Sequence, residues 1–518
     1  MLLQLSYALA LSALLQPATS RFQAYIETPN WIETDGYNFH TPKNKIPMPS
    51  LVIDTFQNKI HNDLGYWHGA GEDLPVHHEP GFVRLDPTDP DQNFHTQFNI
   101  HGCFSLIPWQ HQFLHVVFEG TEEFTVSLNE HNIDCEPLRS PFPGVPDSVQ
   151  ASRYVMRTKA GWGAGDDGDE WNSGADGDDN GDGETTAGPA QKQNHRRNPL
   201  RKKPMHRAAN GSCVEDGDED GGDGSDDGND GDENGDEGHR PASPEKTELF
   251  IPLSHFNINH TRVVSVSFTG FYTNVSLVLR RVEFVSTVPR PSAENNYFKI
   301  PEKAPSGTLV LRCSRPNSFA FGIDDGQPRF AQRVMRILDE EGVRATFFVV
   351  GAGLTDLSTN FTNFYREMID KGHQVALHSN THPKMEALPT IDQIDEEIVR
   401  TIQVFHDELG VQSRYFRPPF GTVGARMRQQ LAKRIPHPLI VNWSVDVEDW
   451  LWANTSTPEK QLEAFYRNVA RGGNLAVLHF LSPTTVEYLP TFIRHVKAVG
   501  LSIMRIDQCL EDPDSPPL

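Results

Sequence analysis

The stretch Phe321-Gly-Ile-Asp-Asp-Gly326 is the point from which the fold of the C-terminal half can be worked out. It closes an apolar run, 318–323, which predicts a buried strand, and a glycine then ends that strand. Neighbouring side chains at a strand end point to opposite sides, so one of Asp324 and Asp325 can bind a cation while the other faces a substrate. A single Asp-Asp-Gly triplet is more often a solvated turn, and its meaning depends on the surrounding sequence.

Short apolar runs alternate with amphipathic segments around and after this stretch. Strands are predicted near 318–323, 345–351, 374–379, 413–417, 439–446, 475–480 and 501–507. Helices are predicted at Phe330–Leu338, Ile391–Leu409, Ala425–Ile435, Lys460–Ala470 and Tyr488–Val499. This alternation predicts a parallel α/β sheet or barrel, whose functional side chains gather at the carboxyl ends of the strands.

Five of the seven predicted strands end in ionisable side chains. Asp324-Asp325 are followed by His378-Ser-Asn-Thr-His382, Arg417-Pro-Pro-Phe-Gly421, Asp446-Val-Glu-Asp449-Trp450 and Leu478-His479. One such motif alone would be explained by ordinary hydrogen bonding or surface ion pairing. Five motifs at the same edge of one sheet predict an active site.

The two histidines of the second motif suggest a metal site. His378 and His382 bracket three residues, a spacing that can turn both imidazoles toward one ion. With one carboxylate they form a set that leaves positions open for water and substrate, as in catalytic zinc sites. Non-haem iron uses a similar set, but its oxygenases are usually antiparallel barrels, which disagrees with the α/β pattern.

With these five motifs in this order, residues 314–510 resemble a NodB-type polysaccharide deacetylase. That family is the chitin deacetylase and acetylxylan esterase group, carbohydrate esterase family 4. The resemblance implies an incomplete (β/α) barrel and a divalent metal, with Zn²⁺ as the expected ion. It further implies that Asp325, His378 and His382 hold the metal.

The same resemblance implies roles for the other charged residues of the motifs. Asp324 would be the general base, oriented by Arg417. His479 would be the general acid, tuned by Asp446, and Asp449 would pair within the rim. A metal-activated water would then attack an acetyl group, and His479 would protonate the leaving amine.

Three further residues are expected to contact the substrate by the same resemblance: Trp450, Phe420 and Pro418. Phe420 stands where the family commonly has Tyr, and Phe480 where it commonly has Asp. We expect these departures to alter the product side or the substrate loop and to leave the catalysts in place. The first motif also begins Gly322-Ile323 instead of Thr-Phe, which we expect to change packing more than chemistry.

The implied reaction is removal of N-acetyl groups from a polysaccharide such as chitin. Two alternatives stay open at this point. One is an O-acetyl esterase acting on xylan or another acetylated glycan. The other is a catalytically silent carbohydrate-binding protein.

The N-terminal half has short strand-like runs and no long helical periodicity. The runs before residue 155 are Leu51–Phe56, Phe82–Leu85, Phe94–Ile100, Phe113–Phe118 and Phe124–Leu128. The runs after residue 245 are Thr247–Leu253, Val263–Phe268 and Ser276–Val285. We predict one jelly-roll-like antiparallel β-sandwich, made of residues 51–155 and 246–288, which loosely resembles galactose-binding or carbohydrate-binding modules.

An acidic Gly/Asp-rich insertion, 156–245, separates the two parts of this sandwich. Residues 161–240 hold 22 acidic and 8 basic residues and so contribute −14 to the net charge of −24. Such a composition predicts disorder. Residues 176–181 begin like a calcium-binding loop, but the twelfth position is Ala187 instead of Glu, which favours a solvated linker. The rest of the chain is mildly acidic, and we expect no nucleic-acid partner.

The chain ends and linkers complete the predicted layout. Residues 1–20 carry an apolar run followed by small residues, which predicts a secretory signal peptide. Residues 21–50 are a lead-in, 289–312 a linker, 313–510 the deacetylase-like domain and 511–518 a tail. No other run approaches a membrane span. We expect a secreted monomer, located outside the cell or in the cell wall, that acts on an acetylated polysaccharide or oligosaccharide.

Cysteines and glycosylation motifs agree with secretion. We expect disulfides between Cys103 and Cys135 and between Cys313 and Cys509, with Cys213 left over. The glycosylation candidates are Asn259, Asn274, Asn360 and Asn454, and Asn210 also fits the pattern. Asn442 fits it too, but it lies in a strand-like run and is expected to be buried and unmodified.

Overall fold

The computed structural model describes residues 49–99, 102–132, 135, 146–156, 246–289 and 299–518. The predicted signal peptide, most of the lead-in, the acidic tract and Cys213 lie outside these residues. Residues 50–518 form one compact unit. None of the helices in the described parts of the chain combines the length and the apolar composition that a membrane span requires.

Two antiparallel sheets make up the N-terminal domain. The first contains β1 (Leu51–Asp54), β3 (Val76–Glu79), β4 (Phe82–Leu85), β6 (Phe113–Gly120), β9 (Thr247–Pro252) and β11 (Leu277–Val285). Its order is β3-β4-β11-β6-β9, with β1 paired to β11. The second contains β2 (His68–Gly71), β5 (Asn93–Gln97), β7 (Thr125–Glu130), β8 (Pro146–Gln150) and β10 (Val263–Thr269). Its order is β2-β5-β10-β7-β8.

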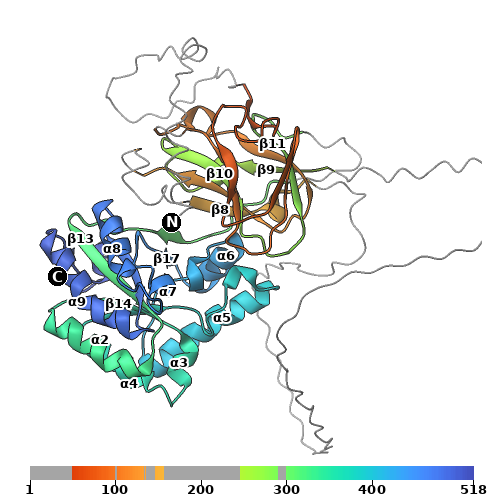
Figure 1. The fold of residues 1–518 in the computed structure, drawn as a ribbon. Coiled ribbons are helices and arrows are strands. Elements are labelled where there is room, and N and C mark those ends of the chain that lie inside the picture. Colours follow the sequence, from red (N-terminus) through yellow and green to blue (C-terminus); the bar gives the residue numbers. More distant parts are fainter. Residues whose placement is uncertain (1–48, 100–101, 133–134, 136–145, 157–245, 290–298) are drawn as a thin grey trace, which may run out of the picture. The chain divides into compact units, whose positions relative to one another are not determined.

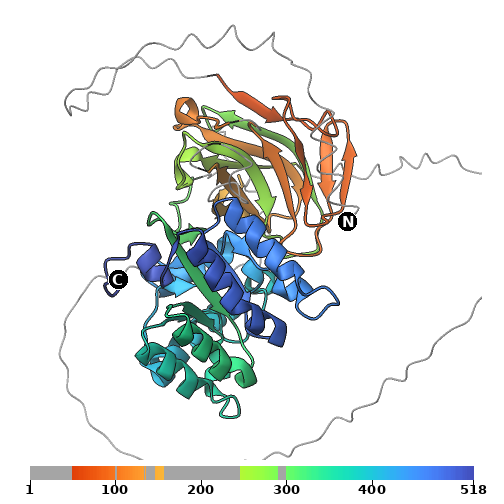
Figure 2. The ribbon, with the colours of Figure 1, turned by 60° about the vertical axis from the view of Figure 1, so that its left-hand side comes forward.

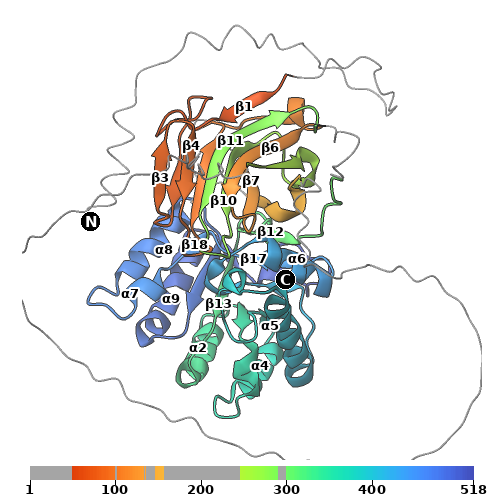
Figure 3. The same ribbon diagram turned by 90° about the vertical axis from the view of Figure 1, so that its right-hand side faces the viewer.

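Strands from both sides of 157–245 pair with one another in each sheet. The green strands β10 and β11 lie beside the red and orange strands in Figures 2 and 3, and β10 pairs with both β5 and β7. Side chains of the two sheets share one buried cluster, which includes Phe118 and Leu279 from the first sheet and Phe268 from the second. The two sheets therefore form a single folded domain around one core.

Three strands of this domain, β2, β3 and β8, were not predicted from the sequence. They lie at the edges of the sheets, where burial requires little alternation of apolar and polar residues along the strand. The sequences of β2 and β3, His68–Gly71 and Val76–Glu79, are rich in His and Gly, and β8 begins with a proline. Pairing with neighbouring strands, which sequence patterns do not reveal, makes these segments extended.

A parallel sheet forms the C-terminal domain, in the order β12-β17-β16-β15-β14-β13-β19-β18, with β20 paired to β13. The strands are β12 (Thr308–Val310), β13 (Ser318–Asp324), β14 (Thr346–Val349), β15 (Gln374–Leu377), β16 (Tyr415–Phe416), β17 (Leu439–Val441), β18 (Val445–Asp446), β19 (Leu475–His479) and β20 (Ser502–Ile503). Parallel pairing requires crossover connections, which here contain the helices. Helices α2, α4 and α9 lie beside β13 and β14 (Figure 1).

The helices of this domain confirm the predicted alternation. They are α2 (Pro328–Glu340), α3 (Gly351–Thr355), α4 (Phe361–Asp370), α5 (Ile391–Val404), α6 (Ala425–Arg434), α7 (Asp449–Trp452), α8 (Lys460–Ala470), α9 (Pro483–Ala498) and α10 (Ile506–Cys509). Helix α5 continues into a π-helical turn, Phe405–Leu409, within the predicted segment. Helix α4 and the short helices α3, α7 and α10 were not predicted, and α10 begins inside the predicted strand 501–507.

The prediction of a single strand at 439–446 is wrong, because these residues form two separate strands, β17 and β18. β18 is the last strand at one end of the sheet order, and β17 is next to last at the other end. Only residues 442–444 connect them, and such a link spans at most about 14 Å. The two ends of the sheet therefore approach each other, as an incomplete barrel requires. The predicted linker 289–312 also contains a strand, β12, which pairs with β17.

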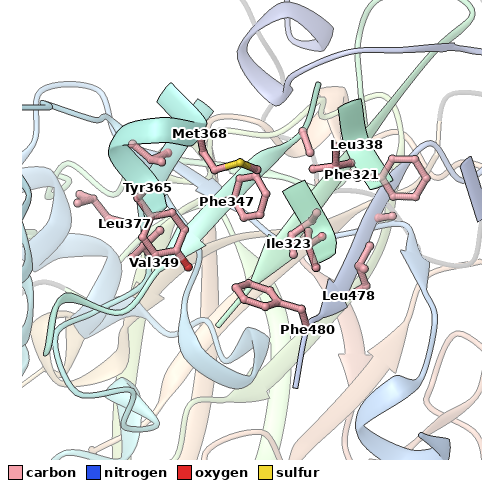
Figure 4. Close-up of a cluster of buried hydrophobic side chains, with 14 of the residues drawn as sticks. Phe321, Ile323, Leu338, Phe347, Val349, Tyr365, Met368, Leu377, Leu478 and Phe480 are labelled. Carbon is pink, nitrogen blue, oxygen red and sulfur yellow. The ribbon is translucent and has the colours of Figure 1, made fainter. Parts of the chain in front are cut away.

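Buried side chains from the strands and helices form the core of this domain. Figure 4 shows Phe321 and Phe347 from β13 and β14 together with Met368 from α4. Phe480 belongs to the same core: it is 1% exposed and its ring centroid is 6.1 Å from that of Phe364. This side chain packs inward over Gly326, where a Cβ would overlap its ring, so Phe480 is a core residue. Its effect on the product side or the substrate loop stays a prediction.

Both predicted disulfides are confirmed. Cys103 bonds with Cys135 across 32 residues, and Cys313 bonds with Cys509 across 196 residues. Cys509 is fully buried, and its carbonyl oxygen accepts hydrogen bonds from the backbone N–H groups of Ser314 (3.2 Å) and Arg315 (2.9 Å). The second disulfide thus joins the two ends of the C-terminal domain.

We predict that Cys509→Ser lowers the free energy of unfolding by about 2–5 kcal/mol, because the unfolded chain gains the freedom of a long loop. Denaturant unfolding followed by circular dichroism measures this change. Cys135→Ser opens a much shorter loop and is the matched control, with a smaller expected loss. Equal losses in the two variants would contradict the loop-length argument.

Candidate active site

The predicted strand-end motifs meet at one cavity of about 680 Å³. β13 and β18 end at the aspartates Asp324 and Asp446, β19 ends at His479, and β15 ends just before His378. Every predicted catalytic, metal and substrate residue lines this cavity except Arg417, which is completely buried beneath it. The parallel strands therefore bring together residues that are up to 155 positions apart (324 to 479) in the sequence.

Asp325, His378 and His382 form a group whose possible ligand atoms all lie within 4.8 Å of one another. Nε2 of His378 is 3.7 Å from Oδ1 of Asp325, and Nε2 of His382 is 3.5 Å from its Oδ2. Oδ1 of Asp325 is buried without a hydrogen-bond partner among the described residues. An unpartnered buried carboxylate oxygen facing two imidazoles fits a divalent cation.

The surroundings of His378 keep its imidazole in a form that can bind a metal ion. Its Nδ1–H donates a hydrogen bond of 2.7 Å to the carbonyl oxygen of Arg417, which leaves the lone pair on Nε2. Burial lowers the pKa of His378 to about 4, so the imidazole is neutral at neutral pH. A neutral imidazole with a free Nε2 is the form that binds a metal ion.

Unusual backbone conformations place the ligands. Asp325 and His382 have φ values of 50° and 63°, in the left-handed region that non-glycine residues rarely adopt. The backbone N–H of His382 donates to Oγ of Ser379 (3.0 Å), itself left-handed at φ 59°. Such strain persists where the surrounding structure determines it, and it is commonly found at functional sites.

Asp324 is 2% exposed and is held by a buried ion pair. Nη1 of Arg417 donates a hydrogen bond of 2.6 Å to its Oδ1, while Nε of Arg417 donates to the carbonyl oxygen of Val441 at 2.9 Å. Burial raises the pKa of Asp324, and the guanidinium opposes that rise. The guanidinium needs the glycine at 322, because a Cβ there would lie 2.5 Å from Nη1. The departure at Gly322 therefore does change packing, against the arginine that orients Asp324.

Asp449, and not Asp446, is the hydrogen-bond partner of His479. Nδ1–H of His479 donates to Oδ1 of Asp449 at 2.8 Å, and its backbone N–H donates to Oδ2 at 2.7 Å. Burial lowers the pKa of His479, but the Asp449 carboxylate outweighs this effect and raises the pKa to about 10. The assignment of Asp446 as the tuning residue is wrong, because the short helix α7 turns Asp449 back under the imidazole.

Asp446 has a different environment on the same wall. Its Oδ1 accepts a hydrogen bond of 2.7 Å from the backbone N–H of Glu448, which helps to hold the turn into α7. Burial raises the pKa of Asp446 to about 6. It lines the cavity and carries negative charge above that pH.

Exposed apolar side chains surround the cavity. Trp450 is 70% exposed and Phe420 is 58% exposed, and both were predicted to contact the substrate. The Phe420 ring lies 4.9 Å from the ring of His382. Several other residues that line the cavity were not predicted from the sequence: Trp443, Lys384, Leu481, Glu72 and Asp91. Trp443 lies inside the predicted strand 439–446, where no local pattern indicated that the chain turns between β17 and β18.

The asparagines of the candidate glycosylation motifs differ in their surroundings. Those at 259, 274, 360 and 454 are exposed, as attachment of a glycan requires. Asn454 also lines the cavity, so a glycan on it would stand beside the site. Asn442 uses its Nδ2, the atom that a glycan would modify, to donate a 2.8 Å hydrogen bond to the carbonyl oxygen of Gly421. Glycosylation itself stays a prediction.

Residues 312–435 match the family described as polysaccharide deacetylase. The chain contains a polysaccharide deacetylase domain. The match to this domain includes the Asp324-Asp325, His378–His382 and Arg417 motifs and ends before Asp446. The family match therefore does not reach Asp449 and His479, and the structure alone brings these two residues together.

Several curated proteins are similar to the region that contains the deacetylase domain. The peptidoglycan-N-acetylglucosamine deacetylase PgdA of Listeria monocytogenes is 28% identical over 218 residues, 42% of this chain and 43% of PgdA. A chitin deacetylase of Pestalotiopsis sp is 27% identical over 209 residues, 40% of this chain and 68% of that protein. This chain thus spans less than half the length of PgdA. The solved chitin deacetylase of Colletotrichum lindemuthianum aligns with 40% of this chain and 94% of its own, at 24% identity and a TM-score of 0.37.

We predict that Asp449→Asn lowers the pKa of His479 from about 10, because burial still disfavours the imidazolium while only the charges of Asp324 and Asp325 remain to support it. The imidazolium of the variant loses its proton at a correspondingly lower pH. A titration of the histidine ring signals by NMR, on metal-free protein, measures the change. Asp446→Asn is the matched control, and an equal effect of the two variants would contradict the assignment.

Proposed function

We propose that this protein is a secreted, metal-dependent hydrolase that removes N-acetyl groups from a polysaccharide such as chitin. One observation carries the proposal. A candidate metal group, a buried aspartate oriented by an arginine, and a histidine paired to an aspartate all face a single cavity. Amide hydrolysis needs these three functions together: an activated water, a base and an acid.

The metal would be held by Asp325, His378 and His382, and Zn²⁺ suits two imidazoles and one carboxylate. When bound, such an ion polarises the acetyl carbonyl and makes the attacking water more acidic. The neutral state of His378 and the unpartnered Oδ1 of Asp325 support this assignment.

Asp324 is the proposed general base. It lies beside the metal group, since its Oδ2 is 3.8 Å from Nε2 of His378. The ion pair with Arg417 uses Oδ1 and holds the carboxylate in one orientation, so Oδ2 stays available to accept the proton of the attacking water. The arginine thereby acts as a positioning residue, because it is buried away from the cavity.

His479 is the proposed general acid. The pair with Asp449 keeps its imidazole protonated at neutral pH, with Nδ1–H bound and Nε2–H left for the substrate. Donation of this proton to the departing nitrogen allows the carbon–nitrogen bond to break. The oxygen of water ends in acetate, and the sugar keeps a free amine.

The proposed substrate class is an N-acetylated glycan. The named activities of similar proteins, on chitin and on peptidoglycan N-acetylglucosamine, support this class. The exposed rings of Trp450 and Phe420 offer flat apolar surfaces beside the cavity, on which a sugar ring can lie. The two disulfides support an oxidising compartment and hence secretion.

The domain layout is part of the proposal. Residues 313–510 are the deacetylase domain, and 51–155 with 246–288 form the accompanying β-sandwich. The loose resemblance of this sandwich to carbohydrate-binding modules stays a prediction.

The test is acetate release from soluble chitin oligosaccharides by metal-stripped protein, with and without added Zn²⁺. We expect zinc-dependent release, and we expect Asp324→Asn to lower kcat by about 10²–10⁴-fold, as loss of a general base does. Asp392→Asn makes the same change on the exposed first turn of α5 and is the matched control. Thermal unfolding of both variants checks that they are folded.

Acetylated xylan is the second substrate in this test. Release from xylan alone would keep the mechanism and identify an O-acetyl esterase. No release from either substrate, with zinc shown to bind by calorimetry, would contradict the proposed hydrolase and favour the catalytically silent alternative.

A further inference from the structure

The cavity of the deacetylase domain has a wall that comes from the β-sandwich. Glu72, in the turn after β2, and Asp91, in the loop before β5, line the same cavity as the metal group. Both belong to the compact unit 50–518. They lie about 230 to 410 positions before the catalytic motifs, at 324–479, and sequence motifs gave no indication of their place.

The two loops that carry these carboxylates are tied together. Gln92, 6% exposed, donates from Nε2 to the carbonyl oxygen of Asp73 at 3.4 Å. Its Oε1 accepts from the backbone N–H groups of Thr88 (2.7 Å) and Asp89 (3.3 Å). One buried amide thus links the turn that contains Glu72 to the loop that contains Asp91.

An ion-pair cluster joins this wall to the metal motif. Nζ of Lys384 is 2.7 Å from Oδ2 of Asp89 and 2.7 Å from Oδ2 of Asp91. Lys384 follows the candidate metal ligand His382 by two residues, and its Nζ is 5.8 Å from the centre of the Phe420 ring. The sandwich carboxylates therefore hold a residue that stands directly beside the proposed reaction centre.

Buried polar contacts elsewhere fix the wall in place. Arg428 of α6 is 2% exposed and pairs with Asp147 of β8 at 3.1 Å. The guanidinium of Arg426 lies 3.6 Å from the centre of the Tyr272 ring. Buried charges tolerate little misalignment, because a separated partner would be left unpaired. The sandwich is thus an integral part of the cavity and differs from a module on a flexible tether.

The wall carries an excess of negative charge. Two carboxylates, Asp89 and Asp91, share the single ammonium group of Lys384, and a third, Glu72, lines the same cavity. Glu72 is exposed and has no ion-pair partner among the described residues. An uncompensated carboxylate beside a sugar-binding cavity attracts a cationic group on the ligand and repels an anionic one. The product of deacetylation, an amino sugar, carries such a cation when protonated.

We propose that Glu72 and Asp91 bind the protonated amine of a sugar next to the acetylated sugar that is hydrolysed. The enzyme would then prefer partly deacetylated chains to fully acetylated ones. This inference rests on the proposed deacetylase function and names a substrate feature that the catalytic residues do not select.

The test compares two soluble chitin tetramers with the full-length protein. One is fully acetylated, and the other carries one free amine beside an acetylated sugar. We expect Glu72→Gln to raise KM for the amine-containing tetramer roughly twofold to fivefold, as loss of a partly exposed ion pair does. KM for the fully acetylated tetramer should stay unchanged. Glu79→Gln removes an exposed carboxylate from β3, outside the cavity lining, and should change neither value.

Ionic strength and a second variant strengthen the test. The preference of the wild-type protein should shrink in about 1 M salt, where charges are screened beyond about 3 Å. Asp91→Asn should act in the same direction as Glu72→Gln. Equal KM changes for both tetramers, or a preference that salt does not weaken, would overturn the proposal.

Failure of the proposed function can be told apart from failure of this inference. If the wild-type protein releases no acetate, calorimetry with a fully deacetylated tetramer still measures binding. Weaker binding by Glu72→Gln than by Glu79→Gln would support the anionic wall. Equal binding by the two variants would overturn it.

Discussion

The buried ion pair between Arg417 and Asp324 is the interaction on which the site depends. Its guanidinium is completely buried, donates to Asp324 at 2.6 Å and also donates to the carbonyl oxygen of Val441 at 2.9 Å. It therefore connects β13, β16 and the end of β17 in one hydrogen-bonded unit. The carbonyl oxygen of the same arginine accepts the Nδ1–H of His378, so one residue orients both the proposed base and a proposed metal ligand. Burying the guanidinium without these partners would cost free energy of folding. The strand ends supply all of the partners.

Two of the three histidines with proposed roles, His378 and His479, differ in protonation because their environments differ. Burial without a dominant carboxylate lowers the pKa of His378 to about 4, which suits a metal ligand. Burial against Asp449 leaves the pKa of His479 raised to about 10, which suits a proton donor. Two imidazoles in one cavity thus suit two different purposes. The Nδ1 of His378 is bonded to a carbonyl oxygen, whereas the Nδ1 of His479 is bonded to a carboxylate.

Much of the deacetylase domain could be predicted from local sequence, and the errors have physical causes. The alternation of strands and helices and the strand-end motifs identified the rim, because periodicity and strand direction are local properties. The choice of Asp446 over Asp449 failed, because the two carboxylates are three residues apart and only the turn into α7 decides which one reaches His479. The burial of Phe480 was not predicted for a similar reason, since it depends on the room that Gly326 leaves in the core.

The sequence by itself determined the chemistry available to this protein: three histidines, paired carboxylates and an arginine in motifs at strand ends, and cysteines spaced for two disulfides. Tertiary structure alone decided which of these groups touch, as in the division of residues 439–446 between opposite ends of the sheet. It also decided that Glu72 and Asp91 of the β-sandwich line the cavity of the deacetylase domain. The physical reason is that hydrophobic periodicity acts over a few residues, whereas sheet closure and domain packing join residues hundreds of positions apart, for which no local pattern exists.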